Sequence, residues 1–61
     1  MTTYTVVSRG KMWDVEANGR VVSKHRKKTR AVSKARDLAD RNDSITVQNR
    51  KGRFQKRIRN P

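Results

Sequence analysis

The sequence predicts a small α+β domain in which one helix packs on one face of an antiparallel β-β-β-α-β-β sheet. Three observations predict this class. Apolar and polar residues alternate over residues 4–9, 12–17 and 44–48, which is typical of half-buried strands. The pair Asn18-Gly19 between two such segments is a strong signal for a β-hairpin. After Thr29 the apolar spacing changes to the 3.6-residue period of a helix.

The first two strands are expected over residues 4–9 and 12–17. The first segment is rich in β-branched residues, and Gly10-Lys11 after it is typical of a turn. Alternation divides the second segment between two faces of the sheet. Its inward residues would be Trp13, Val15 and Ala17, and its outward, solvated residues Asp14 and Glu16.

A third strand is expected from about Arg20 to His25, because Asn and Gly tolerate the positive φ angles of the preceding type I′ turn. Val21 and Val22 would face opposite sides of this strand. One of them must therefore be partly exposed or packed against a partner.

The helix is expected to begin after Thr29, which has the chemistry of an N-cap, and to end near Arg41-Asn42. One apolar stripe runs along it and consists of Ala31, Ala35, Leu38 and Ala39. Because most of these residues are alanine, the helix can lie close to the sheet but buries little surface. Trp13 is expected to supply much of the missing volume.

The last two strands are expected over residues 44–48 and from Phe54 onward, with a turn at 50–53. Ile45 and Val47 would face inward, and Phe54 and Ile58 would continue the inward set at a period of two residues. A disordered basic tail does not need such apolar positions. The segment therefore indicates a folded edge hairpin, with Lys56 on the inner face at the edge and Gln55, Arg57 and Arg59 outside.

Charge is the strongest functional signal in the sequence. The chain has 17 Lys and Arg against 5 Asp and Glu, a formal net charge of +12, and residues 1–19 are neutral overall. The excess forms two clusters: Lys24, Arg26, Lys27, Lys28 and Arg30, and then Arg50, Lys51, Arg53, Lys56, Arg57 and Arg59. Such a concentration of charge destabilises a fold by self-repulsion, and it is typical of proteins that bind polyanions. The clusters are expected to converge, because the loop entering the helix and the last hairpin can lie at the same end of the sheet.

We therefore expect nucleic acid to be the partner, with duplex DNA favoured and RNA as the runner-up. The expected contacts are all the residues of the two clusters except Lys56. Contacts to phosphate release counterions and give affinity with little sequence dependence. Trp13 and Phe54 are expected in the core, so few aromatic residues remain to stack on single-stranded bases. The alternative from another class is a phage interaction module that docks on an acidic host protein.

Enzymatic and metal-binding functions are not expected. Ser23 and His25 share a strand face and could mimic part of a nucleophilic site, but a 61-residue domain has little room for a pocket. His25 has no second soft ligand, because the chain contains no cysteine. The three glycines are isolated and do not form a phosphate-binding loop, so no cofactor is expected either.

The length and hydropathy indicate a single small cytoplasmic domain, of the nucleoid or of a phage-infected host. No apolar run approaches the roughly 20 residues that span a bilayer, so no membrane partner is expected. A chain of this size buries only about 60% of the surface it exposes when unfolded. Homodimerisation would be one way to gain further burial.

A family resemblance covers nearly the whole chain. The pattern combines Tyr4-x-Val6-Val7, Trp13-x-Val15, Thr29 before Ala31, Ala35-Arg36-x-Leu38-Ala39, Ile45-x-Val47 and Gly52-Arg53. It resembles a family of short bacterial and phage proteins that is catalogued as a domain of unknown function. The resemblance supports the fold and brings no established activity. Its members usually carry acidic residues early in the helix, where this chain has Arg30, Ser33 and Lys34.

Overall fold

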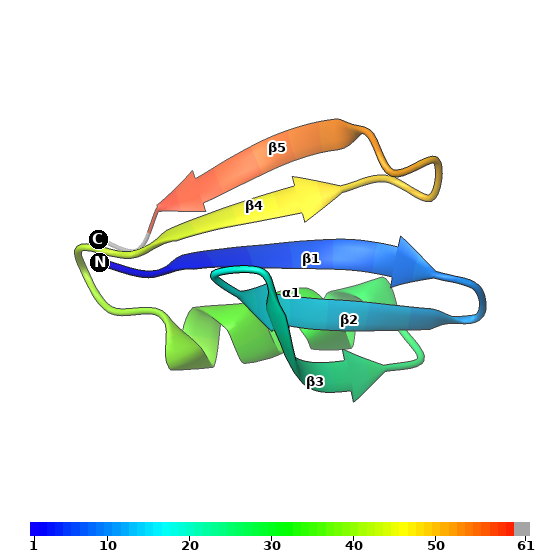
Figure 1. Ribbon diagram of the computed structural model, residues 1–61, viewed down its shortest axis with the longest axis horizontal. Helices are drawn as coiled ribbons and strands as arrows, with labels where there is room; N and C mark the ends of the chain where they lie inside the picture. Colours follow the sequence, from blue (N-terminus) through cyan, green and yellow to red (C-terminus); the bar gives the residue numbers. More distant parts are fainter. Residues whose placement is uncertain (60–61) are drawn as a thin grey trace.

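A computed structural model describes residues 1–59, which form a five-stranded sheet with one helix on one face (Figure 1). The elements in chain order are β1 (Thr3–Arg9), β2 (Met12–Ala17), β3 (Arg20–His25), α1 (Lys28–Leu38), β4 (Ser44–Gln48) and β5 (Phe54–Arg59). The α+β class and the β-β-β-α-β-β order are those that the sequence predicts.

The sheet has the strand order β3-β2-β1-β4-β5. Three of its pairs are antiparallel, but β1 and β4 are parallel, with Thr3 beside Ser44 and Val6 beside Val47. The prediction of a wholly antiparallel sheet is therefore wrong at this central pair. The cause is α1, which runs back along the sheet after β3, so that β4 begins at the end of the sheet where β1 also begins (Figure 1).

The Asn18-Gly19 turn has the predicted conformation. Both residues have positive φ, 51° for Asn18 and 87° for Gly19, as the hairpin requires. The Asn18 side chain also accepts a hydrogen bond from the Thr3 backbone N–H at 3.1 Å. The turn is thus tied to the start of β1.

Helix α1 is shorter than predicted at its C-terminus, and its N-cap is a different residue. Lys27 is the N-cap without a side-chain hydrogen bond, so Thr29 lies inside the helix. At the other end Ala39 is already extended, with ψ of 136°. The backbone N–H of Asp40 then donates to Asp43 Oδ2 at 2.9 Å, and this local turn replaces further helical bonds. No helix among the described residues is long and apolar enough to cross a membrane.

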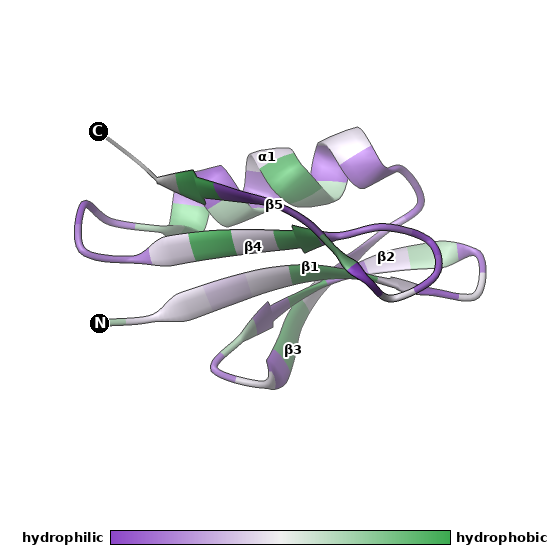
Figure 2. Ribbon diagram, turned by 90° about the horizontal axis from the view of Figure 1, so that it is seen from above, coloured by the Kyte–Doolittle hydropathy of each residue, from purple (hydrophilic) through white to green (hydrophobic). Residues whose placement is uncertain are grey.

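The core lies between α1 and the sheet face that it covers. Val6, Val15, Ile45 and Val47 are fully buried there, together with Ala31 and Ala35 of the helix. Trp13 is only 6% exposed, as predicted, whereas Leu38 is 37% exposed and leaves the predicted stripe. The helix packs on β1, β2 and β3 and reaches β4 only at its margin. Figure 2 shows the helix along one side of the sheet; we call the opposite side the open face.

Both edge strands contain a β-bulge that the alternation of residues does not predict. Between β2 and β3, Val15 is opposite Ser23 and Glu16 is opposite Val21, which leaves Val22 of β3 as the extra residue. Between β4 and β5, Val47 is opposite Lys56 and Gln48 is opposite Phe54, which leaves Gln55 of β5 as the extra residue. A bulge changes the face of every residue beyond it.

The bulges explain two departures from the sequence analysis. Val21 and Val22 are both exposed, at 45% and 51%, instead of only one of them. Phe54 is 62% exposed and is not a core residue. Val47 faces the core, so the next residue, Gln48, faces the open side. Phe54 lies opposite Gln48 and therefore faces the open side too. Ile58 lies opposite Ile45 and packs against the core as predicted.

The variant Trp13→Ala is expected to unfold most of the domain. Removing a buried aromatic side chain costs about 3–5 kcal/mol, which is comparable to the stability of so small a core. Far-UV circular dichroism with urea titration measures the loss. Val21→Ala is the control, because it removes an exposed apolar side chain and should stay within about 0.5 kcal/mol of the wild type. A stable Trp13→Ala domain would show that the indole does not support the core.

A second prediction concerns Asp43, which accepts hydrogen bonds from the backbone N–H groups of Thr2 and Asp40 at 2.7 and 2.9 Å. The bond from Asp40 and then that from Thr2 lower the pKa of this carboxyl. Its contribution to stability is therefore present above the unfolded-state pKa of about 3.9. It is lost as the pH falls through the lower pKa of the folded state.

We expect Asp43→Asn to lower the thermal midpoint at pH 7. The difference from the wild type should shrink below about pH 4, because the unfolded wild-type chain then binds a proton at Asp43, and it should disappear once the pH is below the lowered pKa of the folded state. Asp37→Asn is the matched control, because Asp37 is an exposed helical carboxylate. A difference for Asp43→Asn that stays constant between pH 7 and pH 2 would contradict the prediction.

Candidate functional site

The first basic cluster and the beginning of the second lie at the same end of the sheet. Strands β1, β3 and β4 all run in one direction, so the segment after β3 and the turn after β4 reach the same end (Figure 1). We call residues 24–30 and 50–53 together the basic end. Two segments that are distant in the sequence thus form one region of the molecule, because β4 is parallel to β1.

Lys28 links the first part of the basic end to β5, which directly follows the second part. Its ammonium group donates a hydrogen bond to the side-chain oxygen Oε1 of Gln55, the extra residue of the β5 bulge. The same ammonium lies 5.5 Å from the centre of the buried Trp13 ring, at the distance of a cation–π contact. The first turn of the helix is thereby connected both to the core and to the last strand. Gln55, predicted to face outward, instead reaches the helix side through the bulge.

The turn at 50–53 has a defined shape because Asn49 organises it. Oδ1 of Asn49 accepts hydrogen bonds from the backbone N–H groups of Lys51 and Arg53, at 2.9 and 3.0 Å. Gly52 provides the positive φ, 79°, that the turn requires. The sequence analysis does not assign this role to Asn49, although an Asn at the start of a glycine-containing turn is a recognisable signal.

The other predicted contact residues differ in how far they lie from the 50–53 turn. Most of them have exposed side chains: Lys24, Arg26, Lys27, Arg30, Arg50, Lys51, Arg53 and Arg57. Arg57 lies opposite Thr46, in the middle of the sheet edge. Arg59 lies opposite Ser44 at the far end from the turn, and its side chain falls outside the described part of the chain. The structure therefore brings together the predicted contact residues of the basic end, but not Arg57 or Arg59.

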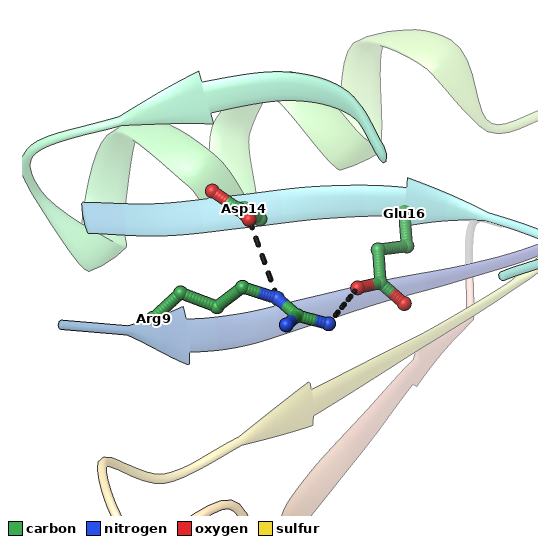
Figure 3. A network of polar contacts seen from close by, with 3 residues as sticks. All are labelled: Arg9, Asp14 and Glu16. Carbon is green, nitrogen blue, oxygen red and sulfur yellow. Dashed lines mark hydrogen bonds and ion pairs between the residues drawn. The ribbon is translucent and has the colours of Figure 1, made fainter. Parts of the chain in front are cut away.

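The open face carries an ionic network of Arg9, Asp14 and Glu16 (Figure 3). Nε of Arg9 lies 3.4 Å from Asp14 Oδ2, and an η nitrogen of Arg9 donates to Glu16 Oε2 at 3.0 Å. Asp14 is only 3% exposed, so the prediction that it is solvated is wrong. It lies between Val7 of β1 and Lys24 of β3, and Arg9 extends across it. Its other oxygen, Oδ1, is buried without a hydrogen-bond partner among the described residues.

The network affects where the positive charge of the domain stays unbalanced. Arg9 already contacts two carboxylates, so much of its charge is neutralised within the domain. The basic end contains no acidic residue in either of its two segments. The unbalanced positive charge is consequently concentrated there.

The Ser23 and His25 pair does form, on the side of β3 that faces the core positions of β2. Oγ of Ser23 lies 2.5 Å from Nε2 of His25, and both residues stand opposite core positions of β2. His25 is opposite Trp13 of β2. The acidic residue next to Trp13 is Asp14, and its side chain faces the other side of the sheet. No group of three or more metal-ligating side chains occurs among residues 1–59.

The variant Arg9→Gln is expected to destabilise the fold, since it leaves the buried Asp14 carboxylate without its cation. The expected cost is about 1 kcal/mol, at the low end for such a loss because Arg9 is largely exposed. Urea titration measures it. Lys11→Gln removes the same charge from the adjoining turn of the same hairpin and should be nearly neutral. Adding Asp14→Asn to Arg9→Gln should recover stability; no recovery would show that the pair is not the cause.

Comparison with known proteins gives a family but no activity. Neither the search of curated proteins nor that of solved structures found a match. A family model described as "Uncharacterized protein conserved in bacteria" matches residues 4–60. The predicted resemblance is thereby confirmed: the chain belongs to this family, DUF2188.

Proposed function

We propose that the protein binds nucleic acid through phosphate contacts, without sequence preference, and that duplex DNA is its main target. One observation carries the proposal. The first cluster of cations and the beginning of the second, which are distant in the sequence, meet at one end of the sheet, and the contact between Lys28 and Gln55 joins the two segments that carry them. A binding surface for a polyanion needs such an arrangement, whereas charge that served solubility alone would not have to converge.

The electrostatics support phosphate as the ligand. The side chains of the basic end are exposed apart from His25 and Lys28, so most of its cations can approach an anion without unfolding any element. Each phosphate that a cation neutralises releases condensed counterions, which favours association. Arg50 and Arg53 also carry the planar, multidentate group that fits phosphate oxygens.

The dimensions support a short site. The molecule measures 30 × 19 × 19 Å, and the basic end lies at one end of its long axis (Figure 1). A face about 19 Å wide corresponds to about six base pairs at 3.4 Å each. The chain offers few amide side chains near this end, namely Gln48, Asn49 and Gln55. Asn49 and Gln55 are already hydrogen-bonded within the domain, which favours contacts to the backbone over contacts to base edges.

A salt titration tests the proposal. We expect the logarithm of the affinity to fall linearly with the logarithm of salt concentration, with a similar slope for unrelated duplex sequences. Gel shifts on duplex DNA, single-stranded DNA and duplex RNA at two salt concentrations rank the three ligands. A saturable one-to-one complex with an acidic protein, and no shift with any nucleic acid, would replace the proposal by protein docking.

The triple variant Arg50, Arg53 and Arg57→Gln tests the site. We expect the salt slope to fall by about one for each phosphate that the variant no longer neutralises, about three in all, with the fold retained by circular dichroism. The matched control is Arg20, Lys34 and Arg41→Gln, which has the same net charge but keeps the basic end. If both variants bind equally weakly, net charge and not this site accounts for binding.

A further inference from the structure

Phe54 differs from the other two aromatic residues of the chain. Trp13 is in the core, and Tyr4 is half-buried with its hydroxyl group donating to the Leu38 carbonyl at 3.2 Å. Phe54 is 62% exposed and follows directly after the basic turn. A large apolar ring is therefore presented to solvent beside the most positively charged part of the molecule.

The exposure of Phe54 follows from the bulge in β5. Because Gln55 is the extra residue, Phe54 is opposite Gln48 and shares the open face with it. Gln55 itself is held by Lys28 on the helix side. The contact that joins the two basic clusters thus also stabilises the register that turns Phe54 outward.

The surroundings of Phe54 are cationic and polar. Arg53 precedes it in the chain, and Arg57 is the next residue of β5 on the open face, because it lies opposite the outward-facing Thr46. Gln48 lies across from it on β4. An apolar ring among cations fits a ligand that is anionic and also has flat aromatic surfaces.

Other occupants fit less well. A second copy of the chain, pairing along β5, would bring Lys56 and Arg57 against their own kind, and like charges opposite each other are destabilising. An apolar peptide would leave the neighbouring arginines without a counter-charge. Nucleic acid supplies both features, since its phosphates are anionic and its bases have π faces.

We propose that Phe54 stacks on a nucleobase of the nucleic acid that the basic end holds. The inference rests on the proposed function, because the cations position the strand whose base meets the ring. The base is either unpaired, as in a single strand, or part of a base step that the ring opens in a duplex. Both cases involve the same contact between the ring and a base face.

The experiment measures the affinity of three probes at one salt concentration. They are a single-stranded oligonucleotide, a strand with the same number of phosphates but abasic at every position, and a duplex. We expect Phe54→Ala to weaken binding of a base-containing probe by about 5- to 150-fold, the range for one stacked base, and to leave the abasic strand unchanged. The salt slope should stay the same because the number of neutralised phosphates does not change.

Further variants identify the source of the base. Phe54→Trp should retain affinity in either case. Phe54→Leu should bind the single strand as weakly as Phe54→Ala, because stacking needs an aromatic face. It should keep its affinity for the duplex if the side chain acts as an apolar wedge between base pairs. Val21→Ala is the matched control, because Val21 is an exposed apolar residue of the opposite edge strand. It should change no affinity.

The outcomes separate this inference from the proposed function. If Phe54→Ala weakens binding of the abasic strand as much as binding of the other probes, the ring holds the neighbouring arginines in position and does not stack on a base. If it weakens no probe, the stacking inference is wrong while phosphate binding stands. If the wild type binds none of the three probes, the proposed function is wrong and the inference with it.

Discussion

The parallel pairing of β1 with β4 is the constraint on which the arrangement of this domain depends. It places β4 next to the N-terminal strand and makes the β4–β5 turn point toward the end where β3 finishes and α1 begins. Near the start of β4, Asp43 accepts a hydrogen bond from the Thr2 N–H, and the Thr2 carbonyl accepts one from the N–H of Ser44 at 3.1 Å. If β4 ran in the opposite direction, the 50–53 turn would lie about one strand length away from Lys28.

Local sequence patterns predict the elements of this fold well and their pairing less well. The Asn18-Gly19 turn and the inward position of Trp13 follow from short-range rules, and both occur in the structure. Alternation misplaces Phe54 because it assumes an unbroken period of two, and a bulge depends on the partner strand. It misplaces Asp14 for a similar reason, since the side chain that covers it, Arg9, comes from the neighbouring strand. Topology predicts that the two basic clusters converge, but the Lys28–Gln55 contact depends on the three-dimensional register.

The thin core and the high charge are connected at Trp13. The alanine surface of α1 contributes little volume, so the indole ring is the largest side chain in the core cluster. The same ring lies beneath the Lys28 ammonium, which in turn reaches β5. One aromatic residue therefore fills the space under the helix and also receives a cation of the basic end. The stability of the core and the position of that cation are not independent.

The two bulges have a consequence for how copies of this chain can meet. They occur in β3 and β5, which are the two edges of the sheet, and each edge also carries cationic side chains such as Lys24 and Lys56. Bulges and lysines are features that discourage edge strands from joining into a larger sheet. If the protein binds a polyanion as proposed, neighbouring copies on it would thus be discouraged from fusing into a continuous sheet.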